Sequence, residues 1–359
     1  MKKYLVLYIA CLMTLSTLSV QAGNPDRIGE AGAYELLING WARSAGLFGM
    51  NSATVSGVEA MRINPAGLAG IQGTEINISY SSWLTGADVN IYKAGFGQRL
   101  GEENIIALSV MSLDFGEINR TTVNLPEPVL GTFSPTFINI GIGYSRIFSN
   151  SITGGVTLRV VNESIEDIGA TGFAVDLGLQ YVTGPKENIH FGVSMRNVGT
   201  PMRYRGDGFT FRGEAPDNDF NMSLSQRTEK FELPSLLNIG IGYDFYMGPV
   251  DSDEEDAKND HRLTINANFT SKSVGKDFIG AGLEYAYREM FMARVGYRYE
   301  EGITNETDRE TAHTGLAAGL SFDVPISKGD NGSRLGIDYA YRPTYVWNGT
   351  HTAGIRLTL

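Results

Sequence analysis

Cysteine and histidine are scarce in this chain of 359 residues, which contains one cysteine and four histidines. Cys11 lies in an apolar segment at the start, so the remainder can hold no disulfide framework, catalytic thiol or cysteine-ligated metal. The histidines are not spaced as metal ligands in the manner of HExxH; they are His190, His261, His313 and His351. The chain also lacks GxSxG, Walker A and paired-carboxylate motifs, so we expect no enzyme, no cofactor and no metal site.

Basic side chains are outnumbered, since 29 Lys and Arg face 40 Asp and Glu and give a formal net charge of −11. Phosphate neutralisation needs clustered Lys and Arg, so nucleic acid is not an expected partner. Long apolar runs are also missing after residue 22, where none approaches the ~20 residues that a spanning helix needs. The mean hydropathy of −0.12 is typical of a soluble protein. A membrane barrel can show the same average, because its strands alternate apolar and polar residues.

The first 22 residues have the pattern of a cleaved secretory signal peptide. Lys2 and Lys3 form its positive start, residues 4–20 its apolar core, and the VQA at 20–22 its small-residue cleavage site. A permanent membrane helix or a lipid anchor on Cys11 are the alternatives. The polar segment that begins at residue 23 and the very short apolar run before Cys11 favour cleavage. Loss of both lysines would change the formal charge from −11 to −13.

Alternation with a period of two residues is what this sequence has in abundance. The hexapeptide NIGIGY occurs at 139–144 and at 238–243, with Ile and Tyr on one face and Asn and Gly on the other. Similar segments follow one another from residue 74 to the end and predict about fourteen strands, the first three (75–83, 89–98 and 104–115) being the least regular. Glycine is a poor strand former. Its repeated use on one face therefore indicates that something lies close against that face.

A soluble β-sandwich would alternate in the same way, but two features favour a membrane barrel. The apolar face tends to end in Tyr or Phe, like the aromatic girdles of outer-membrane barrels. The polar face carries full charges in mid-strand, which suit a polar lumen: Arg159, Asp176, Arg196, Glu284, Arg294 and Asp338. These charges could mark a transport path or a lattice of ion pairs that stiffens a plugged barrel, and we favour the lattice.

The lengths of the connections test the barrel independently. Short connections at 148–151, 184–187 and 288–290 follow even-numbered strands, whereas long ones at 116–135, 197–234 and 300–313 follow odd-numbered strands. This asymmetry is typical of the periplasmic turns and external loops of bacterial barrels. We therefore predict an all-β fold, a 14-stranded antiparallel transmembrane β-barrel in the outer membrane.

Residues 23–73 lack the alternation and carry a family resemblance. They contain ARSAG at 42–46 and NPAG at 64–67, directly before the first predicted strand. This order resembles the FadL-like superfamily of outer-membrane barrels, and more closely its PorV/PorQ family from the Bacteroidota. The resemblance implies a barrel over residues 74–359 and a hatch over residues 23–73, in or under the lumen. It also implies a structural hatch motif, with ligand binding as the alternative role, that consists of Arg43, Asn64, Pro65, Ala66 and Gly67.

Two functions follow from the resemblance. The first is a non-enzymatic, PorV-like partner subunit of a protein secretion or envelope-assembly machine, as in type IX secretion, whose partners are other outer-membrane proteins. The second is a FadL-type channel for hydrophobic small molecules, with the hatch gating a lateral opening. The channel needs an apolar pocket, against which the inward charges argue, although such a pocket could lie between the hatch and the loops.

The long connection at 197–234 is the candidate surface for a protein partner. Arginine and aromatic residues are enriched at protein interfaces, and this loop interleaves them: Arg203, Tyr204, Arg205, Phe209, Phe211 and Arg212. The alternative is a loop that folds over the mouth of its own barrel.

Overall fold

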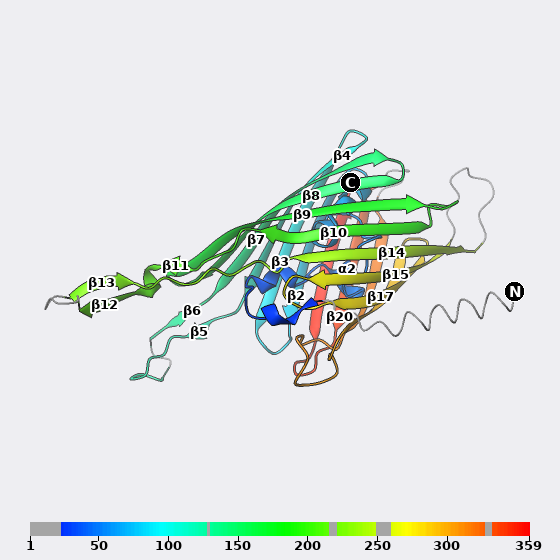
Figure 1. Cartoon of the computed structure of the whole chain (residues 1–359). Helices are drawn as coiled ribbons and strands as arrows, with labels where there is room; N and C mark the ends of the chain where they lie inside the picture. Colours follow the sequence, from blue (N-terminus) through cyan, green and yellow to red (C-terminus); the bar gives the residue numbers. More distant parts are fainter. Residues whose placement is uncertain (1–22, 128–129, 215–220, 249–259, 327–331) are drawn as a thin grey trace.

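The computed structural model describes residues 23–127, 130–214, 221–248, 260–326 and 332–359, so the predicted signal peptide lies outside the described residues. Fourteen long antiparallel strands form a barrel (Figure 1): β2 (Thr74–Trp83), β3 (Val89–Leu100), β4 (Asn104–Asp114), β7 (Thr136–Ser149), β8 (Ile152–Ile165), β9 (Ile168–Thr183), β10 (Ile189–Gly199), β14 (Leu236–Met247), β15 (His261–Lys272), β17 (Phe278–Tyr287), β18 (Phe291–Glu300), β19 (Leu316–Pro325), β20 (Arg334–Arg342) and β21 (Thr350–Thr358). The sheet closes on itself because β2 pairs with both β3 and β21, and β10 with both β9 and β14. The predicted 14-stranded barrel is confirmed.

The wall has an apolar outer face and a polar inner face, because side chains on a strand point alternately to its two sides. On β7, Ile142 exposes 63% of its surface, while the neighbouring Asn139 and Ser145 on the inner face are buried. Ile78 on β2 and Ile355 on β21 are 59% and 57% exposed. Such a belt of exposed aliphatic and aromatic side chains is what the hydrocarbon core of a bilayer covers.

A hatch formed by residues 23–73 threads the barrel (Figure 1). Its elements are β1 (Gly23–Asn24), η1 (Pro25–Arg27), η2 (Tyr34–Leu37), α2 (Ala42–Gly46), α3 (Ala60–Ile63) and η3 (Pro65–Gly70). No helix in the described ranges is long and apolar enough to cross a membrane. The hatch starts at the end of the barrel with the long loops, where β1 pairs with β16 (Gly275–Lys276). It ends at the opposite, short-turn end, where Leu359 N donates to Thr74 O over 2.8 Å.

Inward-facing glycines in the wall make room for the hatch. A Cβ atom added to Gly155, Gly192 or Gly296 would lie 2.4–2.5 Å from hatch backbone atoms, a distance that real Cβ atoms do not show. The glycines of both NIGIGY copies do the same for hatch side chains, since Gly143 faces Leu68 and Gly242 faces Thr54. The alternation therefore places isoleucine against lipid on the outer face and glycine against the packed plug on the inner face.

The long loops carry further short elements outside the barrel. They are β5 (Ile118–Asn119), β6 (Thr132–Phe133), β11 (Arg205–Gly206), η4 (Asp207–Phe209), β12 (Thr210–Glu214) and β13 (Asn221–Ser225). β11 extends the edge of β9, and the β12–β13 hairpin projects away from the barrel beyond it (Figure 1).

Candidate ligand cavity

Ion pairs between neighbouring strands neutralise most of the inward charge. Arg159 and Asp176 are 2.8 Å apart, and Glu284 pairs with both Arg294 and Arg262. Asp338 accepts a hydrogen bond from Ser321 and lies 4.0 Å from Arg356. Five of the six inward charges singled out from the sequence therefore belong to the lattice, and Arg196 is the exception.

A cavity of about 790 Å³ lies between the hatch and the long loops. This volume is in the range of pockets that enclose small organic molecules. The hatch forms one side of the cavity, and its apolar side chains come from hatch, wall and loops: Ile38, Phe48, Ile63, Trp83, Leu113, Phe115, Phe137, Phe231, Leu236 and Phe278. An apolar pocket therefore does exist in this lumen, despite the inward charges of the strands.

Aromatic rings and guanidinium groups form one corner of the cavity. The His313 ring lies 5.7 Å from that of Phe48 and 5.1 Å from that of Trp83. Arg298 and Arg342 approach the Phe48 ring at 4.4 and 5.8 Å, distances at which a cation is attracted by the ring face. Burial, with the charges of Arg342 and Arg298, lowers the pKa of His313 to about 2. His313 is therefore neutral at any physiological pH and is no proton sensor.

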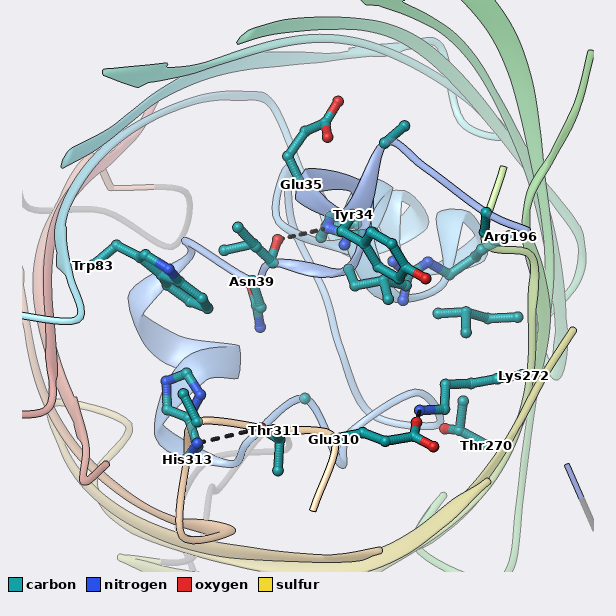
Figure 2. Close-up of a pocket in the computed structure, with 18 of the residues that line it drawn as sticks. Tyr34, Glu35, Asn39, Trp83, Arg196, Thr270, Lys272, Glu310, Thr311 and His313 are labelled. Atoms are coloured by element: carbon teal, nitrogen blue, oxygen red, sulfur yellow. Dashed lines mark hydrogen bonds and ion pairs between the residues drawn. The ribbon is translucent and has the colours of Figure 1, made fainter. Parts of the chain in front are cut away.

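Arg196 enters the cavity from β10, opposite Trp83 and His313 (Figure 2). It is 5% exposed, and among the described residues it has neither an ion pair nor a hydrogen bond. The nearby Lys272 differs, because its Nζ lies 3.4 Å from Glu300 and 3.5 Å from Glu310. A buried charge without a partner is costly. The Arg196 guanidinium is thus free to bind an anionic group next to the apolar side chains of the cavity.

A second cavity of about 490 Å³ lies at the short-turn end and shares no lining residue with the first. Its lining is charged and includes the lattice residues Glu284 and Arg294 together with Arg43 and Glu59 of the hatch. The hatch therefore separates an apolar compartment on the long-loop side from a charged one on the short-turn side.

The predicted hatch motif lies against the wall and not in the apolar cavity. Arg43 pairs with Glu59 over 2.9 Å and donates to Ser56 O. Asn64 is fully buried, and its Nδ2 donates to Ser52 O in the hatch and to Leu179 O in β9. Pro65 and Ala66 meet the wall at Gly155. Gly67 is required because a Cβ there would lie 2.1 Å from Val55 O.

The six candidate partner-contact residues do not form one surface. Arg203 donates to Thr228 O within the loop, and the Tyr204 ring packs 5.4 Å from Phe231 at the cavity. Arg205 and Arg212 are exposed, Phe211 is 53% exposed on β12, and Phe209 is half-buried in η4. The first part of the loop thus folds over its own barrel mouth, whereas the hairpin part extends outward.

Glu35, Glu163, Phe48 and Trp83 line the cavity but were not singled out by the sequence. Glu163 carried a signal, because it is a charged residue in the inward register of β8, two positions after Val161. Glu35 and Phe48 lie in the hatch, where no periodicity distinguishes a cavity-lining residue from its neighbours.

Comparisons place this architecture among known folds. The sequence matches no family model and no curated protein. Its structure is similar to that of the toluene transporter TodX from Pseudomonas putida, with a TM-score of 0.53 and 12% identity over 89% of this chain and 97% of that chain. A Pseudomonas aeruginosa FadL homologue gives a TM-score of 0.50 with 10% identity, over 88% and 97% of the two chains. The chain has the fold of FadL-type outer-membrane channels.

This FadL-like barrel is an outer-membrane protein, as its apolar belt requires, and its structural neighbours are transport channels and not enzymes. The predicted outer-membrane location and the FadL-like fold are confirmed. The narrower resemblance to PorV and PorQ gains no support, because the similar structures are channels of the FadL type.

Proposed function

We propose that this protein is a FadL-type outer-membrane channel for small apolar molecules, in which the cavity between hatch and long loops receives the ligand. The observation that carries the proposal is the apolar cavity of about 790 Å³, lined largely by the side chains that ligand pockets use. Its position between the hatch and the long loops supports the proposal. The fold supports the same role, since TodX is described as a monoaromatic hydrocarbon channel.

Saturable binding of toluene tests this function. Nanodiscs that contain the barrel should retain radiolabelled toluene above the level of empty nanodiscs. Ala312→Trp should abolish this excess by filling the cavity, since Ala312 lines it. Ala94→Trp is the matched control, because Ala94 is exposed and pairs with the lipid-facing Ile78. Retention that does not saturate, or that survives Ala312→Trp unchanged, would count against the channel.

Arg196 indicates that the proposed ligand carries a polar group at one end. Its guanidinium is buried and unpaired among the described residues, and the cavity that it lines also contains many apolar side chains. An amphipathic molecule with an anionic group suits both features, because a hydrogen bond to a charged group contributes about 1.5–3 kcal/mol. The preferred ligands are therefore apolar molecules that carry a carboxylate or a similar anion.

A pair of probes that differ only in charge tests the role of Arg196. We expect 4-butylbenzoate to bind more tightly than butylbenzene, and Arg196→Gln to weaken only the benzoate, by roughly 10- to 100-fold. Arg146→Gln serves as the control, since Arg146 pairs with Glu103 on the exterior of the short-turn end. Equal losses for both probes would show that Arg196 supports the fold of the cavity and not an anion.

The partner-subunit role in type IX secretion stays a prediction, because no comparison and no converging surface favours it. Co-purification in gentle detergent would test it directly. A companion outer-membrane protein recovered in a fixed ratio would support the secretion role, whereas a lone barrel that binds toluene would support the channel.

A further inference from the structure

Two buried carboxyl groups meet where the hatch touches the wall. Glu35 in η2 is 4% exposed, and within the described part of the chain neither of its carboxyl oxygens has a hydrogen-bond partner. Its carboxyl group lies against that of Glu163 on β8, which is 2% exposed. The Tyr204 hydroxyl, from the loop at 200–235, donates to Glu163. One small cluster thus joins the hatch, the wall and a long loop.

The surroundings of the pair supply no positive charge that would neutralise it. Glu163 from β8 and Tyr204 from the loop are the titratable groups that act on Glu35. The other packed side chains are apolar: Ala33 and Leu36 from the hatch, Ala170 and Ala174 from β9, and Met202, Phe231 and Leu233 from the loop. Arg196 and Lys272 line the same cavity from β10 and β15, but neither forms an ion pair with either glutamate among the described residues. Because burial and the charge of Glu163 both disfavour its ionised form, Glu35 keeps its proton.

Little else polar holds η2 to the barrel. Among the described residues, the backbone hydrogen bonds of η2 stay inside the hatch and run from Leu36 N to Ala33 O and from Ile38 N to Glu35 O. The inner hatch is held differently, because Asn64 and the wall glycines fix its backbone against β8 and β9. The segments on either side of η2 are held separately, since Gly32 N donates to Glu232 O and Arg342 donates to Asn39 O. Loss of the glutamate pair therefore frees η2 itself and leaves the rest of the hatch in place.

We propose that Glu35 and Glu163 form a proton-operated latch, which holds η2 against the wall and loop and releases it when both carboxyl groups ionise. In the closed state Glu35 is protonated, so its hydroxyl, which has no other partner among the described residues, can donate to the adjacent Glu163 carboxylate. When that proton leaves to water, two adjacent negative charges repel one another and η2 moves into the cavity space. The latch involves only the hatch, the wall and the loop, so this proposal does not depend on which ligand the cavity binds.

The direction of the pH dependence follows from the environment of Glu35. Burial, followed by the charge of Glu163, raises the pKa of Glu35 to about 8. The latched state is therefore fully stable below the ordinary pKa of a glutamate, near 4.5, and its stability is lost as the pH rises through about 8. Burial, with Glu163 beside it, also raises the pKa of Tyr204, so its hydroxyl remains a donor across this range.

A spin label next to Glu35 reports the state of the latch. Tyr34 is 49% exposed and lines the cavity, so a nitroxide on Tyr34→Cys, with Cys11→Ser to leave a single thiol, samples η2 directly. In nanodiscs from pH 5.5 to 9.5, we expect the immobilised fraction to fall at least twofold with a midpoint near pH 8. Glu35→Gln should stay immobilised throughout, because its amide donates to Glu163 without titrating. Glu30→Gln should keep the full transition, since Glu30 is exposed and pairs with Arg27.

Glu163→Gln is the second variant and decides the matter if Glu35→Gln fails to fold, as judged by heat-modifiable gel mobility. Its amide can donate to an ionised Glu35, so most of the transition should disappear. A wild-type label that remains immobilised to pH 9.5 would overturn the latch. So would a wild-type transition that persists unchanged in the Gln variant of either glutamate.

Discussion

Gly155→Ala should loosen the hatch by adding a methyl group to the wall where the hatch backbone touches it. The new Cβ would lie 2.4 Å from the carbonyl carbon and oxygen of Pro65 and 2.7 Å from the nitrogen of Ala66. These are backbone atoms, so no side chain can rotate away, and the hatch or β8 must move. Overpacking of this kind costs about 1–3 kcal/mol. We expect that loss in the free energy of unfolding in lipid, together with a raised ion conductance through the barrel.

Gly354→Ala is the matched control for this prediction. Gly354 is also an inward-facing wall glycine, on β21, but the nearest atom to an added Cβ is Ala42 Cβ at 3.5 Å, an ordinary contact. Its stability and conductance should match those of the wild type. If both glycine variants lose stability equally, the effect belongs to strand propensity and the packed hatch does not explain it.

Asn64→Ala should produce the largest loss of stability among the hatch residues. Asn64 is completely buried and satisfies three backbone groups, namely Ser52 O, Leu179 O and Ala66 N. Removal of the amide leaves all three without this partner in a closed space, and each buried unsatisfied group costs about 1–3 kcal/mol. We expect a total loss of about 3–5 kcal/mol, part of it offset by relaxation.

Equilibrium unfolding by urea in lipid vesicles measures this loss, and Asn162→Ala gives the comparison. Asn162 donates to Thr171 on an exposed part of the barrel, so its replacement should cost less than about 0.5 kcal/mol. An Asn64→Ala protein as stable as the Asn162→Ala protein would show that the NPAG motif does not anchor the hatch. Ligand binding would then return as its explanation.

The barrel could be predicted from sequence because the wall repeats one local rule. Every strand alternates between lipid and lumen, so a segment such as 139–144 reveals its two faces without knowledge of its neighbours. The inward glycines likewise predicted that a plug packs against the inner face, although they did not predict where it lies. Ion pairing of five inward charges followed from the same register, since Arg294 and Glu284 are cross-strand partners on β18 and β17.

The cavity could not be predicted in this way, because its residues come from parts of the chain that obey no common period. Glu35 lies in a short 3₁₀ turn, Trp83 at the end of β2, and His313 in a loop. Whether these three residues come together depends on the path that the hatch takes through the barrel. Arg196 looked like its five charged counterparts in the sequence, and only the arrangement of neighbouring strands shows that it lacks a carboxylate.

The PorV/PorQ assignment gained no support, and the packing of the hatch suggests a physical reason. The ARSAG and NPAG segments are buried against the wall, where Asn64 faces Gly178 and Gly46 faces Gly319. These motifs seat the plug tightly against the wall of this barrel. Their packing is explained by architecture and does not by itself indicate a protein partner or a ligand.

The two attachments of the hatch differ greatly in strength. At the long-loop end, β1 and β16 pair over two residues on each strand, and the hatch bonds to one loop residue, Glu232. The opposite end continues covalently into β2 beneath the buried NPAG segment. Thermal opening will thus begin at the weaker end and stop at the stronger one. Such a plug provides two barriers in series, so the outer compartment can exchange its contents with the medium while the inner seal still blocks the leakage of ions.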